Sequence, residues 1–214
     1  MAFEFEQSLT PTENRDTTTP GLVSRRSIWR DAIEIILLIA TIYTLVNLAT
    51  TRYEVIGDSM LPNFFTGEHI IVNRFAYYFG NPARGDVIVM IDPRDKTVNF
   101  IKRMIGLPGE QVQIKAGRVY INGTLIDEPY IHEFCPKNCD GNWSLKGDEY
   151  FVLGDNRPVS FDSHILGPIP RNLIVGQAWI LYWPLKDIGM VSHPAYRPIA
   201  PNPSPATGLA RLIH

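Results

Sequence analysis

The chain has 214 residues, of which 45% are hydrophobic and 20% charged, and its formal net charge is −2 at pH 7. This length allows one sizeable domain with an anchor and tails, and the composition is that of an ordinary folded protein. The near-neutral charge lacks the basic footprint of a nucleic-acid-binding protein, so we expect no nucleic-acid partner.

The N-terminal region predicts a membrane anchor. Residues 1–24 are polar and show no apolar period, so we interpret residues 1–30 as a tail. The run 32–51 that follows carries one formal charge, Glu34, near its start. Twenty helical residues span about 30 Å, the thickness of a hydrocarbon core. We therefore predict a transmembrane helix over 31–51.

Two alternatives to a membrane span have less support. A buried core helix usually keeps a polar stripe, which this run lacks. A cleaved signal peptide has a shorter leader and a small-residue cleavage site after the run. Arg25, Arg26 and Arg30 precede the span and only Arg52 closely follows it. The positive-inside rule then places the N-terminus in the cytoplasm and the rest outside.

Short β-type segments with turn signals follow the span. Ala116-Gly117 and Asn122-Gly123 each separate two such segments, and Asn-Gly is a strong hairpin signal. With no long amphipathic helix between them, the segments predict a mainly β domain over 52–187, with a small insertion around 111–147. The predicted strands cover 53–57, 70–72, 86–91, 99–105, 112–114, 119–121, 124–126, 149–153 and 174–182.

The end of the chain is rich in proline, and we interpret 188–214 as a disordered tail. The two cysteines, Cys135 and Cys139, lie inside the predicted insertion. They fit free thiols or a short-loop disulfide, and the sequence slightly favours the disulfide. Half of a metal site is a third interpretation, but no second Cys/His pair with suitable spacing follows. We therefore expect no metal and no cofactor.

The segment Gly57-Asp58-Ser59-Met60-Leu61-Pro62 directly follows a predicted strand, just beyond the span. Gly57 permits a sharp turn and Pro62 stops further extension. A serine on such a turn can be exposed beside a free backbone N–H. Taken alone, the segment is better explained as an ordinary turn.

Lys102 lies in a predicted strand. It directly follows Ile101, and the apolar pair Met104-Ile105 comes shortly after it. If its side chain faces the packed side, desolvation disfavours the ammonium form and lowers the pKa. A neutral amine is then available as a base. The ordinary alternative is an edge-strand lysine with its ammonium in water.

A third segment, 154–164, is a dense polar turn directly after the apolar strand ending at Leu153. A serine hydroxyl is a weak nucleophile until a base takes its proton. Lys102 can be that base for Ser59, Ser160 can hold the amine in place, and the Ser59 backbone N–H can donate to the oxyanion. The three segments together therefore predict one Ser/Lys mechanism.

Other hydrolytic signatures are missing from the sequence. It contains no His-Glu-x-x-His run, no Gly-x-Ser-x-Gly and no phosphate-binding loop. The five histidines are scattered. A Ser-His-Asp triad is defined by geometry, and the sequence gives it no positive support.

In their order and spacing, four segments resemble the sequence boxes of type I signal peptidases, also called leader peptidases. The boxes are 57–62, 84–87, 101–110 and 154–163, and the resemblance covers about residues 25–185. It implies a mostly β catalytic domain held by one N-terminal transmembrane helix in the cell membrane. It also implies an endopeptidase that removes signal peptides from secretory preproteins. Its expected partners are these signal peptides and the lipid of the membrane.

The resemblance also assigns roles to residues of this chain. It makes Ser59 the acylated nucleophile, Lys102 the general base and Ser160 the hydroxyl that orients the base. Supporting polar contacts would come from Arg103, Asp155 and Asp162. The substrate would bind as an added strand between 53–59 and 100–102. Shallow pockets for its small side chains would be lined by Ile56, Met60 and Ile101.

The chain departs from the family pattern at two places. Gly57 stands where some members have a serine that assists the oxyanion, which leaves backbone donors for this task. His164 stands where arginine is frequent, and Pro158 and Val159 replace polar residues, so this departure concerns the local support network and not the Ser59–Lys102 pair. Two rivals remain: a Ser/Lys self-cleaving regulator, for which 1–30 is too short to supply a DNA-binding module, and a non-enzymatic peptide-binding β domain.

Overall fold

The computed structural model describes residues 25–194, so the tails predicted at 1–24 and beyond 194 lie outside the described residues. The chain divides into two compact units, Met1–Thr44 and Leu45–His214. The prediction of a mainly β fold with one N-terminal apolar helix is confirmed.

The apolar helix α1 covers Arg25–Ala49, which is longer at its start than predicted and shorter at its end. The stretch Ile28–Ala49 is long and apolar enough to cross a membrane, and none of its apolar window is buried. The predicted bounds followed the apolar run, but the helix continues through the residues that precede it. Thr50 and Thr51 belong instead to a strand, where these β-branched residues pair with Asn73 and Val72.

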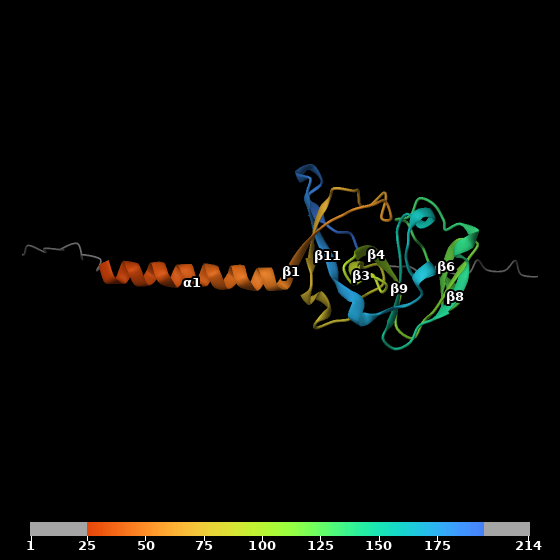
Figure 1. Cartoon of the computed structure of the whole chain (residues 1–214), viewed down its shortest axis with the longest axis horizontal. Helices are drawn as coiled ribbons and strands as arrows, with labels where there is room; N and C mark the ends of the chain where they lie inside the picture. Colours follow the sequence, from red (N-terminus) through yellow and green to blue (C-terminus); the bar gives the residue numbers. More distant parts are fainter. Residues whose placement is uncertain (1–24, 195–214) are drawn as a thin grey trace, which may run out of the picture. The chain divides into compact units, whose positions relative to one another are not determined.

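A curled antiparallel sheet forms the larger part of the second unit (Figure 1). Its order is β1-β2-β11-β3-β4-β9-β10, and β12 also pairs with β11. These strands are β1 (Thr50–Glu54), β2 (His69–Asn73), β3 (Val87–Ile91), β4 (Asn99–Gly106), β9 (Glu149–Leu153), β10 (Ile169–Pro170), β11 (Ile174–Trp183) and β12 (Gly189–Met190).

A smaller four-stranded sheet has the order β7-β6-β5-β8. Its strands are β5 (Gln111–Lys115), β6 (Arg118–Ile121), β7 (Thr124–Leu125) and β8 (Gly141–Ser144). Both predicted turns are present, and their four residues have φ between 50° and 79°. Short helices connect the strands: η1 (Phe75–Tyr77), η2 (Lys137–Cys139), η3 (Arg157–Val159), α2 (Ser163–Leu166), η4 (Arg171–Leu173) and η5 (Leu185–Asp187).

Buried apolar residues join the two sheets. Ile105, Phe151 and Leu153 of the larger sheet share one cluster with Val112 and Val119 of the smaller one. Successive strand residues point to opposite faces, so another face of the larger sheet packs a second cluster, which includes Val55, Met60 and Val72. The second cluster lies under the Ser59 turn, and it therefore gives that turn a rigid base.

Two further predicted boundaries are wrong. The first strand is β1 (Thr50–Glu54) instead of 53–57, because pairing with β2 begins at Thr50. The tail predicted from residue 188 begins too early, since Gly189 and Met190 pair with Leu181 and Ile180. Val191 is buried, and its N–H donates to the Trp179 carbonyl at 2.9 Å. Backbone pairing and this apolar contact hold a segment whose composition alone indicated a tail.

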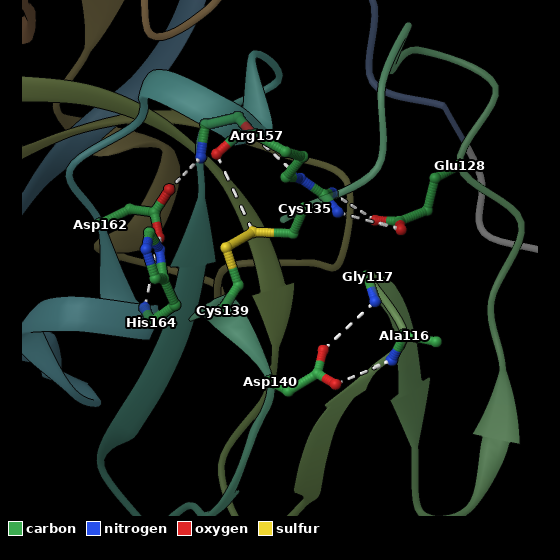
Figure 2. Close-up of a disulfide and its surroundings, with 10 residues drawn as sticks. Ala116, Gly117, Glu128, Cys135, Cys139, Asp140, Arg157, Asp162 and His164 are labelled. Carbon is green, nitrogen blue, oxygen red and sulfur yellow. Dashed lines mark hydrogen bonds and ion pairs between the residues drawn. A yellow bond between two sulfur atoms is a disulfide. The ribbon is translucent and has the colours of Figure 1, made fainter. Parts of the chain in front are cut away.

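A disulfide joins Cys135 and Cys139, the state that the sequence slightly favoured. Figure 2 shows it between two polar pairs, Arg157 with Glu128 and Asp162 with His164. Nearby, the Asp140 carboxylate accepts from the backbone N–H groups of the 116–117 turn, at 3.1 and 3.3 Å. The disulfide loop is thus fixed both to the smaller sheet and to the polar segment after β9.

Candidate active site

Ser59 lies on a turn that is fixed from several sides. Gly57 has φ +93°, a conformation that favours glycine, and its N–H donates to Thr66 Oγ1 at 3.0 Å. Met60 is 1% exposed and anchors the turn in the core. From the other side, the Asn156 N–H donates to the Ser59 carbonyl at 3.0 Å. The Ser59 N–H donates to none of the described residues, which leaves it available to a ligand.

Lys102 extends from β4 to the Ser59 turn. Its backbone pairs with Ile88 of β3, and the residue is 2% exposed. The two side chains meet at a hydrogen bond of 2.8 Å between Lys102 Nζ and Ser59 Oγ. Lys102 Nζ also donates to the Ile101 carbonyl at 3.0 Å and lies 5.3 Å from the centre of the Phe100 ring. The fold therefore joins two of the three predicted segments.

Burial changes the acid–base behaviour of Lys102. Desolvation lowers the pKa of its amine from 10.5 to about 8. The carboxylates of Asp162 and Asp155 act in the opposite direction and limit the fall. Because the value lies near neutrality, a usable fraction of the amine is uncharged there and can accept a proton.

The third segment packs behind this pair. Asp155 accepts from Arg103 Nε at 2.7 Å and Arg103 Nη2 at 2.6 Å, and Asn63 Nδ2 donates to it at 2.9 Å. Arg103 also lies over the Tyr130 ring, 4.3 Å from its centre. This buried bidentate pair connects β4, the strand that carries Lys102, to the loop that carries Ser160.

Asp162 is the second buried carboxylate of the segment. It accepts from the Gly154 N–H at 2.8 Å, and its Oδ1 lies 2.7 Å from His164 Nδ1. His164 therefore takes the place of a basic partner at the position where the sequence pattern left the network uncertain (Figure 2). A carboxylate held in this way exerts its field on Lys102 from a fixed position.

Ser160 lies beside the Ser59 turn, but the structure does not show the expected hydrogen bond to Lys102. Its Oγ is buried and has no hydrogen-bond partner among residues 25–194. A Cβ added at Gly154 would lie 2.2 Å from Ser160 Oγ and 2.4 Å from the Ser59 carbonyl oxygen. Gly154 thus allows the Ser160 loop and the Ser59 turn to approach each other closely.

A small cleft of about 120 Å³ opens beside the pair. Its walls come from 53–56 with Ser59 and from 99–102 of β4, and Ile70 and Val89 lie among its lining residues. Ile56 and Ile101 line it as predicted, whereas Met60 is absent from its lining and is buried in the core. The family resemblance implied that Met60 lines the pocket, but the turn directs its side chain into the core.

The family comparison agrees with this geometry. Residues 28–183 match the family model described as signal peptidase, peptidase S26. The chain belongs to the peptidase S26 family of signal peptidases. A signal peptidase I of Leptolyngbya laminosa is 40% identical over 153 residues, which cover 68% of this chain and 74% of that protein.

Two further relatives show similar coverage. A probable signal peptidase I-2 of Synechocystis is 38% identical over 155 residues, covering 70% of each chain. The signal peptidase I of Bacillus amyloliquefaciens is 35% identical over 189 residues, covering 83% of this chain and 97% of that one. This S26 peptidase is therefore similar to its relatives over most of both chains.

Several residues of this S26 peptidase site were not singled out in the sequence. Asn63 reaches Asp155 from the far end of the Ser59 turn, and Glu128 pairs with Arg157 at the side of the disulfide. Phe100 and Phe161 form a tilted ring pair 6.3 Å apart beside the nucleophile. Arg157 and Phe161 lay in a quoted box, but Asn63 and Glu128 did not, and no spacing signal connects those two residues to the site.

The sulfur atoms do not form a ready metal site. Cys135, Cys139 and His164 offer ligand atoms within 4.8 Å of one another. The two sulfur atoms are bonded to each other, however, so neither is a thiolate, the form that binds metals.

Proposed function

We propose that this chain is a membrane-anchored serine endopeptidase that removes signal peptides from secretory preproteins. The observation that carries the proposal is the buried Lys102 amine, hydrogen-bonded at 2.8 Å to Ser59 Oγ. Membership of the S26 family and the relatives named signal peptidase I supply the substrate class.

The reaction begins when the neutral amine of Lys102 takes the proton of the Ser59 hydroxyl. Ser59 Oγ attacks the scissile carbonyl, and the backbone N–H of Ser59 donates to the oxyanion that forms. Collapse of this intermediate breaks the peptide bond, and the Lys102 ammonium returns a proton to the leaving amine. Water then hydrolyses the acyl-enzyme with Lys102 acting again as the base.

Ser160 has a part in the proton transfer. The Ser160 hydroxyl is buried without a described partner, which costs free energy. A neighbouring group that becomes a stronger hydrogen-bond donor when it takes up a proton would satisfy this hydroxyl. We assign that donor as the Lys102 ammonium, which has three N–H groups to satisfy. The buried pair of Arg103 with Asp155 fixes the strand and the loop that carry Lys102 and Ser160. The Asp162 carboxylate favours the charged form of the Lys102 amine.

The substrate binds as an additional strand in the cleft. On β4, residues 99–102 pair with β3 on one side, and the pairing with β9 begins only at Arg103. Of the described strands, only β2 pairs with β1. Two strand edges therefore meet the cleft, and each can pair with an extended peptide. The cleft volume of about 120 Å³, with Ile56 and Ile101 on its walls, suits small apolar side chains.

The anchor determines where the reaction takes place. Helix α1 fits a single membrane span by its length and composition. Arg25, Arg26 and Arg30 near its start place the N-terminus in the cytoplasm by the positive-inside rule. The catalytic domain then lies on the outer side of the cell membrane, where signal peptides emerge.

Cleavage of a preprotein by the purified chain in detergent tests the proposal. Mass spectrometry of the product should locate the cut directly after a small-x-small motif. Ser59→Ala should abolish cleavage, whereas Ser144→Ala, an exposed serine on β8, should retain it. Full activity of the Ser59 variant, or cuts unrelated to small residues, would refute the proposal.

A further inference from the structure

A second pocket, of about 460 Å³, lies away from the catalytic cleft and shares no lining residue with it. All of its lining residues belong to the Leu45–His214 unit. Leu48 comes from the last turn of α1, Phe75 and Tyr77 come from η1, and Ile174 begins β11. Arg74 and Arg171 also line it, so the pocket combines an apolar wall with two cations.

The pocket is tied directly to the end of the apolar helix. Ala49 is the last residue of α1, and its carbonyl accepts from the Arg74 N–H at 3.0 Å. When Ile28–Ala49 spans a bilayer, Arg74 therefore lies at the membrane–water boundary. This step rests on the membrane placement in the proposed function.

The aromatic residues next to Arg74 fit that depth. Phe75, Tyr78 and Phe79 are 41%, 78% and 91% exposed. Aromatic side chains gather at membrane interfaces, because their rings contact the acyl region while polar edges meet the headgroups. Phe75 and Tyr78 also line the pocket, so its rim is suited to the glycerol and upper acyl part of a lipid.

The two arginines supply charge that the described part of the chain does not balance. Arg171 donates only to neutral acceptors: Tyr77 O at 2.6 Å, Gly80 O at 3.0 Å, Asn81 Oδ1 at 3.2 Å and the Tyr150 hydroxyl at 3.3 Å. Arg74 is exposed, and neither arginine forms an ion pair with residues 25–194. The nearby Asp86 carboxylate is occupied by Tyr77 and Gln177.

We propose that this pocket binds the phosphate headgroup of an anionic glycerophospholipid at the outer face of the membrane. Two guanidinium groups without acidic partners complement a phosphodiester, and arginine is well suited to phosphate oxygens. A zwitterionic headgroup is disfavoured because its ammonium group is repelled by the guanidinium groups of Arg74 and Arg171. The lipid is held where the catalytic domain joins its anchor and thus fixes the domain at the bilayer surface.

Native mass spectrometry of the full chain in detergent tests this site. The protein carries Ser59→Ala, so the result is independent of proteolysis. The probes are dioctanoyl phosphatidylglycerol, dioctanoyl phosphatidylcholine and inorganic phosphate. We expect phosphatidylglycerol to bind at least about tenfold more tightly than either of the other two. Equal binding of the two lipids, or equal binding of inorganic phosphate, would overturn the proposal.

Matched variants separate the pocket from general surface charge. Arg74→Gln should weaken binding of phosphatidylglycerol about tenfold. Arg52→Gln removes the same charge from an exposed position on β1, outside the pocket, and should change affinity less than about twofold. Tyr78→Ser should also weaken binding if the ring contacts the lipid. Equal losses in the Arg52 and Arg74 variants, or none in the Arg74 variant, would refute a defined site.

Discussion

Lys102 Nζ lies 2.8 Å from Ser59 Oγ, although the two residues are 43 positions apart in the chain. Strand β4 carries the lysine and a turn after β1 carries the serine. The lysine is 2% exposed, so the bond forms where water does not compete for the amine.

Replacing the base should stop catalysis without unfolding the domain. Lys102→Met keeps most of the apolar stem but removes the amine, so nothing is left to accept the Ser59 proton. We expect kcat/KM to fall by at least about a thousandfold, as for loss of a general base. Steady-state kinetics on a preprotein peptide measures this, with thermal unfolding as the control for folding. Activity within tenfold of the unchanged enzyme would contradict the assigned role.

The pH profile should follow the ionisation of Lys102. Its pKa is lowered to about 8, and only the neutral form accepts a proton. The rate should therefore rise with pH through about 8 and level above it, with about a tenth of the amine neutral at pH 7. Measurement of kcat/KM from pH 6 to about 10 tests this. A profile that is flat, or that falls across this range, would rule out a neutral lysine base.

Asp162 should shift that profile. Its carboxylate raises the pKa of Lys102 against the larger effect of burial. Asp162→Asn removes the charge, so the midpoint of the kcat/KM profile should move to lower pH. Asp95→Asn removes a carboxylate from an exposed loop and should leave the midpoint unchanged. A shift to higher pH in the Asp162 variant would show that the sign is wrong.

Gly154 should be required for the approach of the two active-site loops. The Cβ of Gly154→Ala would lie 2.4 Å from the Ser59 carbonyl oxygen, which is too close to be accommodated without movement. We expect a large loss of kcat/KM because the nucleophile turn is displaced. Gly147→Ala is the matched control, since a Cβ there meets nothing within 4 Å. Similar activity of the two variants would argue against this close packing.

Loss of Asp155 should destabilise the domain. Asp155→Asn leaves the buried Arg103 charge without its carboxylate, and breaking such a pair costs about 3 kcal/mol of unfolding free energy. Chemical unfolding in detergent measures the change. Glu149→Gln breaks the exposed pair with Lys146 and should have no measurable effect. Equal stability of both variants would mean that the buried pair contributes no more than a surface pair.

The sequence by itself determined the anchor, the mainly β fold and the segments from which the site is built. Local signals sufficed because an apolar run, alternating strands and Asn-Gly turns each depend on neighbours in the chain. They also placed Ser59, Lys102, Arg103, Asp155 and Asp162 among the candidates, through residues that occur in ordered boxes.

Only the tertiary structure decided how these segments meet. Met60 entered the core, Asn63 reached Asp155 and Ser160 Oγ stayed without a described partner, because these outcomes depend on loop packing. The end of the domain also needed tertiary pairing, since β12 is held by β11 and its own composition indicates a tail. Burial of Lys102 and the pKa that follows from it likewise come from strands distant in the chain.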